Sequence, residues 1–417
     1  MQKFVIQGGR RLEGEVLVQG AKNSALPILA ASLLCDGESV LDNCPRLSDV
    51  YAACRILSGL GCRCTLRGHT VQVQAQGMHS SVIPMQLMRE MRSSIIFLGA
   101  VLGRMGRCEL GFPGGCELGP RPIDLHLQAL QRMGVRILED NGVLQCSTPA
   151  GLHGAHIHLQ FPSVGATENI LLAAVLAKGE TIVTNAAREP EIIDLASYLR
   201  GCGARITGDG SSTLCIQGVK QLTGCTYRIM PDRIAAATWM AAAAVTGGEI
   251  ALQQVNPADL VSMTDVFEQM RCRICPFREG LYFHSAKCPK AIRSIRTMPY
   301  PGFPTDAQAI VMAVLCKAKG TSLMEETIFE NRFRHVDALV KMGADIQVAG
   351  RAAVIKGVRS MHGAAVQATD LRGGAAMIVA GLGAAGETTV EQIAHIDRGY
   401  DSPETVLRGL GAEIRRI

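Results

Sequence analysis

Aromatic residues are scarce in this sequence of 417 residues, where they make up 4% and tryptophan occurs once. This scarcity excludes a core built on large rings, and the 45 glycines favour closely packed helices joined by many turns. The hydrophobic fraction of 47% is nevertheless typical of a globular chain. Because one hydrophobic core stops growing at about 250–300 residues, we expect two domains.

Long apolar runs are also lacking, and none reaches the roughly 18 residues of a membrane-spanning helix. The apolar stretch around Met240 is short and follows Asp232 and Arg233, so it predicts a buried helix. The start, MQKFVIQGGRRLEGE, has charges and glycines where a signal peptide has its apolar run. We therefore expect a cytoplasmic protein that does not contact a membrane.

A large excess of one charge is missing too, since 42 basic residues face 37 acidic ones. A nucleic-acid partner is therefore not expected, because such proteins carry a denser basic stripe. The 15 cysteines are odd in number and scattered singly, which argues against a disulfide framework. The one CxxC pair, Cys272 and Cys275, has no second pair at zinc-ribbon spacing, so no metal site is expected.

The sequence contains a repeat of roughly 70 residues. Six helical segments end on similar phrases: LSGLGCRC, LQRMGVRI, LRGCGARI, FEQMRCRI, LVKMGADI and LRGLGAEI. A glycine follows the last helical turn in five of them, and Arg271 takes its place in the fourth. Such a glycine predicts a left-handed C-cap before a strand.

A second, Ala-rich phrase ending in glycine also occurs once in each unit. Its copies are SALPILAASLLCDG, SSIIFLGAVLGRMG, ATENILLAAVLAKG, AAATWMAAAAVTGG, AQAIVMAVLCKAKG and GGAAMIVAGLGAAG. A helix that is hydrophobic all round is buried on all sides. We therefore predict an α/β fold of six units, in which two groups of three units place buried helices inside and sheets outside.

The segment 4–22 resembles 214–232 and 353–371 when Gly14, Gly224 and Gly363 are aligned. Since the sixth unit lacks this segment, the N-terminal copy is expected to complete it. The predicted domains are therefore residues 22–229, and residues 1–21 together with 230–417.

Polar residues recur just before the buried helices, where backbone N–H groups are free and the helix dipole is positive. Simple capping accounts for Ser, Thr and Asp at these positions. It does not account for Lys22, Arg233 and Arg372, which indicate a bound anion. A cleft between the domains, lined by such helix starts, is the predicted active site.

The run Pro113-Gly114-Gly115-Cys116 predicts an exposed turn, in which Cys116 is either a structural thiol or a reactive one near Arg121. Together with the segments around it, this run resembles the UDP-N-acetylglucosamine 1-carboxyvinyltransferase family, and the resemblance extends over residues 1–417. The matching pieces are GAKNSALP, MRSSIIFLG, PGGCELGPRPIDLH, PSVGATENILLAA, PGFPTDAQ, TIFENRFRHVDALVKMGAD, TDLRGGAAMIVAGL and IAHIDRGYDSPE.

The resemblance implies the enolpyruvyl transferase fold, a two-domain inside-out α/β barrel. It also implies transfer of the enolpyruvyl group of phosphoenolpyruvate to the 3-hydroxyl of UDP-N-acetylglucosamine by addition and elimination, the first committed step of peptidoglycan synthesis. No cofactor, metal or obligate protein partner is implied, and the substrates are small molecules. The family further implies that the drug fosfomycin alkylates Cys116.

The resemblance assigns roles by position. The catalytic set is Cys116 as general acid, Asp306 as proposed base, Lys22 and Arg398. The residues implied to hold phosphoenolpyruvate are Lys22, Asn23, Arg121, Arg372 and Arg398, with Asp370 beside them. The contacts implied for the UDP-sugar are Asn23, Arg92, Arg121, Pro122, Ile123, Asp124, Leu125, Ser163, Val164, Gly165, Asp306 and Ile328.

Three alternatives stay open at this point: a non-catalytic or divergent UDP-sugar-binding paralogue, a 3-phosphoshikimate 1-carboxyvinyltransferase, and an RNA-processing enzyme built from similar repeats. One departure from the family pattern bears on the first. Where the family usually has Glu and Gly after PDRI, this chain has Ala235 and Ala237. The exchange would leave stability intact and could affect a hinge or a polar contact across the cleft.

Overall fold

A computed structural model describes residues 2–91, 93–111, 123–286 and 288–417. These residues form two compact units. The described residues between Gly20 and Met230 form the N-terminal domain, and the C-terminal domain combines the chain up to Gln19 with Pro231–Ile417. The sequence placed the two boundaries after residues 21 and 229.

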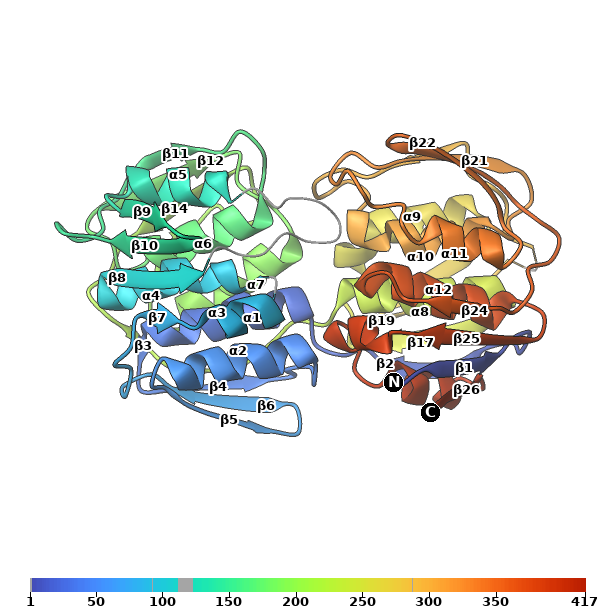
Figure 1. The fold of residues 1–417 in the computed structure, drawn as a ribbon, viewed down its shortest axis with the longest axis horizontal. Helices are drawn as coiled ribbons and strands as arrows, with labels where there is room; N and C mark the ends of the chain where they lie inside the picture. The colour runs from blue at the N-terminus through green and yellow to red at the C-terminus, as the bar shows by residue number, and fades with distance from the viewer. Residues whose placement is uncertain (1, 92, 112–122, 287) are drawn as a thin grey trace. The chain divides into compact units, whose positions relative to one another are not determined.

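In the N-terminal domain, three central helices contact one another inside a shell of sheets (Figure 1). The central helices are α1 (Lys22–Ala31), α4 (Phe97–Met105) and α6 (Val164–Ala174). The other helical segments are η1 (Ser32–Leu34), α2 (Ser48–Gly59), α3 (Met85–Glu90), η2 (Ser94–Ile96), α5 (Asp124–Arg132) and α7 (Pro190–Gly201).

Within the described residues, this domain has three four-stranded sheets and one short pair. The sheets are, in strand order, β16 (Thr226–Arg228), β4 (Glu38–Asp42), β6 (Thr70–Gln74) and β5 (Arg63–Arg67); β7 (Val82–Ile83), β8 (Arg107–Gly111), β10 (Val143–Ser147) and β9 (Arg136–Asp140); and β11 (His156–His158), β12 (Glu180–Thr184), β14 (Thr213–Gln217) and β13 (Arg205–Thr207). The pair is β15 (Leu222–Thr223) and β3 (Cys35–Asp36).

The C-terminal domain repeats this plan. Its central helices are α8 (Arg233–Thr246), α10 (Thr305–Leu315) and α12 (Leu371–Gly383), and its other helical segments are η3 (Pro257–Leu260), α9 (Val261–Gln269), α11 (Val336–Lys341), η4 (Ile393–Arg398) and α13 (Pro403–Gly409). Its sheets are β18 (Arg273–Phe277), β19 (Gly280–His284), β17 (Glu249–Gln253) and β2 (Glu13–Leu17); β20 (Ser294–Arg296), β21 (Thr321–Glu325), β23 (Ala352–Lys356) and β22 (Asp345–Ala349); and β24 (Ala365–Gln367), β25 (Glu387–Glu391), β1 (Phe4–Gln7) and β26 (Glu413–Arg416).

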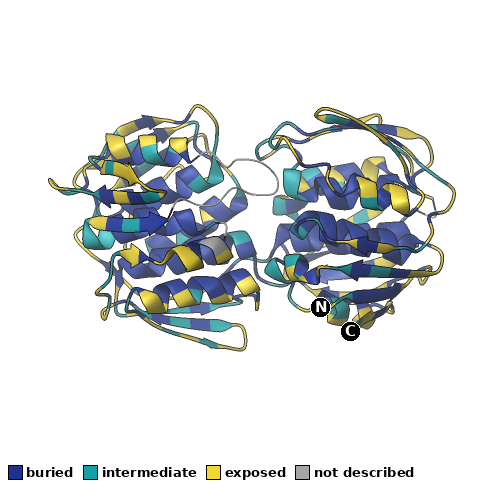
Figure 2. Cartoon of the chain, in the orientation of Figure 1, coloured by how far each residue is buried: buried dark blue, intermediate teal, exposed yellow. Residues whose placement is uncertain are grey.

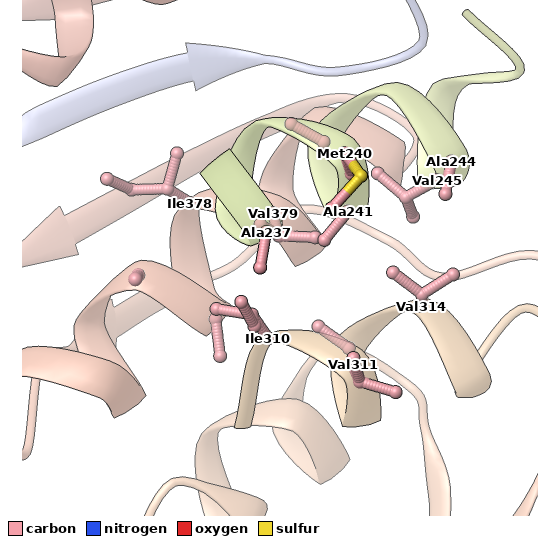
Figure 3. Packing of buried hydrophobic residues seen from close by; sticks show 14 of the residues in the cluster. Ala237, Met240, Ala241, Ala244, Val245, Ile310, Val311, Val314, Ile378 and Val379 are labelled. Carbon is pink, nitrogen blue, oxygen red and sulfur yellow. The ribbon is translucent and has the colours of Figure 1, made fainter. Parts of the chain in front are cut away.

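The inside-out arrangement follows from the sequence of the central helices. Small side chains such as Ala237 and Ala241 of α8 pack against Ile310 of α10 and Val379 of α12 (Figure 3). In each domain the central helices are the buried elements, and exposed residues gather on the outer helices and strands (Figure 2). The predicted fold class is therefore confirmed.

All four-stranded sheets in the described chain share one topology, in which a parallel edge strand comes from a neighbouring unit. The N-terminal segment closes the C-terminal domain in two places. Strand β1 pairs with β25 and β26 and completes the sixth unit, as the repeat predicted. Strand β2 pairs in parallel with β17 of the fourth unit, so only the β1 part of the segment lies in the sheet of the sixth unit. The chain thus leaves one sheet of the C-terminal domain after β1 and enters another sheet of the same domain at β2.

Candidate functional site

In the N-terminal domain, Lys22 and Asn23 lie in the first turn of α1. The Lys22 ammonium is nearly buried, and its Nζ lies 2.6 Å from Oδ2 of Asp49 in the first turn of α2. A cation is unfavourable at a helix start, and a buried one needs a partner. The sequence alone indicated a bound anion there, whereas the structure supplies the carboxylate of Asp49.

Six of the predicted UDP-sugar residues lie at two adjoining helix starts of this domain. Ile123 precedes α5, which begins with Asp124 and Leu125. Ser163 caps α6, where its Oγ accepts a hydrogen bond from the N–H of Ala166 at 3.3 Å, and Val164 and Gly165 follow.

The two helix starts are held together by buried side chains of their own. Nδ2 of Asn169 donates to Nδ1 of His126 at 2.8 Å and to the carbonyl of Ile95 at 3.1 Å, while its Oδ1 accepts from the N–H of Gly99 at 2.7 Å. A side chain at Gly165 would come within 2.9 Å of the His126 ring. Burial lowers the pKa of His126 to about 4, so the ring is neutral and its Nδ1 can accept.

In the C-terminal domain, charged residues meet at the starts of the central helices. Asp306, in the first turn of α10, accepts from Nη2 of Arg372 at 3.1 Å and from Nη2 of Arg332 at 3.0 Å. Asp370 caps α12 by accepting from the N–H groups of Arg372 and Gly373, and it lies 3.9 Å from Nη1 of Arg332. Two carboxylates and two guanidinium groups thus form one network.

The network determines the protonation of its acids. Burial alone would raise the pKa of Asp306, but the guanidinium groups of Arg372 and Arg332 outweigh it and hold that pKa well below its usual range. Burial likewise opposes ionisation of Asp370, and Arg332 together with two backbone N–H groups lowers its pKa. Both carboxylates are therefore ionised at neutral pH.

Arg398 ends the short helix η4, which packs on the first turn of α12. A side chain at Gly374 of α12 would come within 2.6 Å of Ile396 in η4, so the two elements approach closely. The hydroxyl of Tyr400 accepts from Nη1 of Arg372 at 3.3 Å and lies 2.8 Å from Oγ1 of Thr238 in α8. Through the packing of η4, Arg398 is attached to α12, which Asp370 caps and which carries Arg372.

Ile328 follows strand β21, and its N–H donates to Oε1 of Glu326 at 2.8 Å. Arg92, Cys116, Arg121 and Pro122 lie outside the described residues. Among the residues that are described, no group of three His, Cys, Asp or Glu side chains could hold a metal ion, and no helix is long and apolar enough to cross a membrane.

Comparison with known proteins identifies the family. The family model described as EPSP synthase (3-phosphoshikimate 1-carboxyvinyltransferase) matches residues 6–407. UDP-N-acetylglucosamine 1-carboxyvinyltransferase 2 of Caldanaerobacter subterraneus subsp. tengcongensis is 50% identical over 417 residues, covering all of both chains. UDP-N-acetylglucosamine 1-carboxyvinyltransferase 1 of Symbiobacterium thermophilum is 48% identical, covering all of this chain and 95% of that one.

The chain belongs to the UDP-N-acetylglucosamine 1-carboxyvinyltransferase family.

Solved structures confirm the enolpyruvyl transferase fold of this family member. The enolpyruvyl transferase NikO from Streptomyces tendae matches with a TM-score of 0.90 at 24% identity, covering 100% of this chain and 98% of that one. The EPSP synthase from Acinetobacter baumannii matches with a TM-score of 0.76 at 19% identity, covering all of both chains.

Sequence reasoning missed the partners that hold the family residues in place. Asp49, Arg332 and Tyr400 are buried polar groups whose contacts lie on other helices or segments: Asp49 pairs with Lys22, Arg332 with Asp306, and Tyr400 with Arg372. Arg332 lies inside the piece TIFENRFRHVDALVKMGAD, which carried the resemblance but assigned it no role. Asp49 lies in the first turn of α2, where an acidic residue is common, and Arg332 and Tyr400 lie between helices, so no signal in the sequence indicated these contacts.

The family departure at Ala235 and Ala237 falls inside the core of the C-terminal domain. Both side chains are buried in α8, where Ala235 donates its N–H to Oδ1 of the capping Asp232 at 3.0 Å. A glutamate at position 235 would be almost completely buried and would need a partner there. The effect of the exchange on a hinge stays a prediction.

Proposed function

We propose that this chain transfers the enolpyruvyl group of phosphoenolpyruvate to the 3-hydroxyl of UDP-N-acetylglucosamine and releases phosphate. The observation that carries the proposal is the full-length match, at 50% identity, to a relative named for this activity. The charged helix starts support it, because they offer cations for an anionic substrate and a carboxylate for a hydroxyl proton. We place the reaction in the cytoplasm, with two small molecules as the only required partners.

The proposed step begins when the sugar hydroxyl attacks C2 of phosphoenolpyruvate while C3 receives a proton. The resulting tetrahedral ketal then loses phosphate and a proton from C3, which restores the double bond. Asp306 is the proposed base for the hydroxyl proton, and Cys116 the proposed acid at C3. Lys22, Arg121 and Arg398 are proposed to hold the phosphate and carboxylate groups.

The network around Asp306 explains how a strongly ionised carboxylate could act as a base. With Arg372 and Arg332 bound to it, Asp306 holds a proton poorly. When phosphoenolpyruvate binds, its anionic groups would pair with the Arg372 guanidinium and so weaken the ion pair between Arg372 and Asp306. The proton affinity of Asp306 would then rise when both substrates are bound, which couples its basicity to substrate binding.

The test is phosphate release from phosphoenolpyruvate with and without UDP-N-acetylglucosamine. We expect release only when both are present. Release with shikimate 3-phosphate, and none with the UDP-sugar, would favour the other reaction of the wider family. Binding of the UDP-sugar without any turnover would favour a non-catalytic paralogue.

Two variants then test the assigned roles. Asp306→Asn keeps the shape but removes the base, and we expect turnover to fall about a hundredfold or more. Arg398→Ala removes a charged partner of phosphoenolpyruvate, so its main effect should be a higher KM for that substrate. Near-normal kinetics for both variants would show that the site is misplaced.

A further inference from the structure

Glu326 lies directly after β21, and only 1% of its surface is exposed. Both oxygens of its carboxylate accept hydrogen bonds. Oε1 accepts from Oγ1 of Thr297 at 3.0 Å and from the N–H groups of Ile328 at 2.8 Å and Phe329 at 3.1 Å. Oε2 accepts from Oγ1 of Thr305 at 2.9 Å. This acid is therefore occupied by protein donors.

The four donors come from three segments that meet at the candidate site. Thr305 is the chain neighbour of Asp306 in the first turn of α10. Ile328 and Phe329 begin the segment that leads to Arg332. Thr297 makes a second contact with the segment after β21, because its Oγ1 accepts a hydrogen bond from the N–H of Thr327 at 2.9 Å.

The contacts form a closed ring around Asp306. Nη2 of Arg332 donates to Oδ1 of Asp306 at 3.0 Å and to the carbonyl of Thr305 at 3.4 Å. The Arg332 guanidinium lies over the ring of Phe329, with 5.6 Å to its centroid. Glu326 closes this cycle of contacts, because it accepts hydrogen bonds from Thr305 on one side and from Phe329 on the other.

We propose that Glu326 is a positioning residue for the reaction proposed above, on which this inference rests. It fixes the start of α10 against the segment 328–332, and so sets the orientation of the Asp306 carboxylate through Arg332. It also fixes the backbone of Ile328, one of the residues expected to contact the UDP-sugar. A misplacement of about 1 Å at such a group costs up to about a hundredfold in rate.

The variants are chosen to separate geometry from charge. Glu326→Gln keeps the length, and the Thr305 hydroxyl can turn to accept from the new amide, so kcat should stay within about threefold of the parent. Glu326→Asp keeps the charge but is one methylene shorter and cannot reach both sides. Glu326→Ala removes every contact. For these two we expect kcat to fall about ten- to hundredfold.

The matched control is Glu325→Ala at the preceding residue. The side chain of Glu325 is 42% exposed and pairs only loosely with Arg296, at 3.6 Å. We expect its kcat to be unchanged. Rates are to be expressed per folded molecule, with the melting temperature of each variant measured alongside, because a merely structural role would lower the folded fraction and leave kcat of the folded enzyme intact.

A double-mutant cycle with Arg332→Ala tests whether Glu326 affects kcat through its contact chain to Arg332. If Glu326 acts through Arg332, then Glu326→Ala should cost little more once Arg332 is gone. Additive losses, an unchanged kcat in Glu326→Ala, or full activity in Glu326→Asp with a large loss in Glu326→Gln would each overturn the positioning role. An inactive parent enzyme would instead refute the proposed function, and it is seen before any variant is made.

Discussion

Arg271 occupies a backbone position that glycine holds in the five other units. Its φ is 73°, and the matching glycines at 61, 134, 203, 343 and 411 have φ between 90° and 104°. The left-handed conformation costs an ordinary residue roughly 1–2 kcal/mol. A glycine avoids this strain, but it makes the unfolded chain more flexible, and the larger loss of entropy on folding offsets part of the gain. Because the Arg271 side chain is exposed, we expect Arg271→Gly to raise the free energy of unfolding by about 0.5–1 kcal/mol.

Calorimetry of the C-terminal domain transition checks this expectation. The reverse exchange, Gly343→Ala, is the matched control, because a side chain there would also meet the His362 ring at 3.2 Å. It should lower the melting temperature. A lower melting temperature in Arg271→Gly would show that the arginine side chain makes a contribution larger than the backbone strain.

His126 makes the N-terminal domain sensitive to acid. Its folded pKa is lowered to about 4, below the ordinary value of about 6.5, so its contribution to stability is fully present above pH 6.5. That contribution is lost as the pH falls from 6.5 toward 4, and amounts to about 3 kcal/mol at most. The physical cause is burial, which disfavours the charged ring, and the loss of the Nδ1 acceptor for Asn169.

Thermal unfolding at pH 7.5 and pH 5 measures the effect. His126→Gln cannot ionise, so it should be less stable than the parent at pH 7.5 and should lose less stability on acidification. Equal losses in the parent and the variant would mean that other groups govern the acid sensitivity of this domain.

At the scale of elements, one ammonium group joins the ends of the central helices in the C-terminal domain. Nζ of Lys317, which follows α10, donates to the carbonyl of Gly383 at 2.6 Å and to that of Val245 at 3.3 Å. These carbonyls lie at the ends of α12 and α8, where they lack helical partners and the dipole favours a cation.

Lys317→Met keeps the length and removes the charge. We expect it to lower the free energy of unfolding by about 1–3 kcal/mol, because two buried carbonyls lose a charged donor. Lys319→Met is the control, since Lys319 is exposed and only two residues away. If both variants unfold at the temperature of the parent, the ammonium contacts contribute nothing measurable.

At the scale of the whole molecule, the two ends of this chain lie side by side. The N–H of Lys3 donates to the carbonyl of Ile417 at 2.8 Å, and the N–H of Ile417 donates back at 3.0 Å (Figure 1). Strand β1 lies between β25 and β26, so a sheet of the C-terminal domain is built from both ends of the chain. Closing the chain here should disturb nothing.

A circular permutant therefore tests the architecture. We expect a chain that joins Ile417 to Gln2 by a short linker, and opens at the exposed turn Asn141–Gly142, to fold and keep its activity. Opening it between Leu144 and Gln145, inside β10, should prevent folding because β10 pairs on both sides. Melting temperature and phosphate release are the measurements.

The sequence by itself determined the repeat, the buried Ala-rich helices and their glycine caps. These features are local: a helix that is apolar all round, or a glycine after the last turn, has the same meaning wherever it lies. The resemblance then assigned Asp306, Asp370 and Arg372, and the structure shows these three in one network.

Only the tertiary structure decided which charges compensate one another. Lys22 is paired with Asp49, and Asp306 with Arg332 and Arg372, between different helices and segments of each domain. The destination of β2, which joins the fourth unit and not the sixth, was likewise decided by closure of the ring of sheets. Such partners depend on which helix starts and sheet edges the packing of the core brings together, and a local sequence pattern does not identify them.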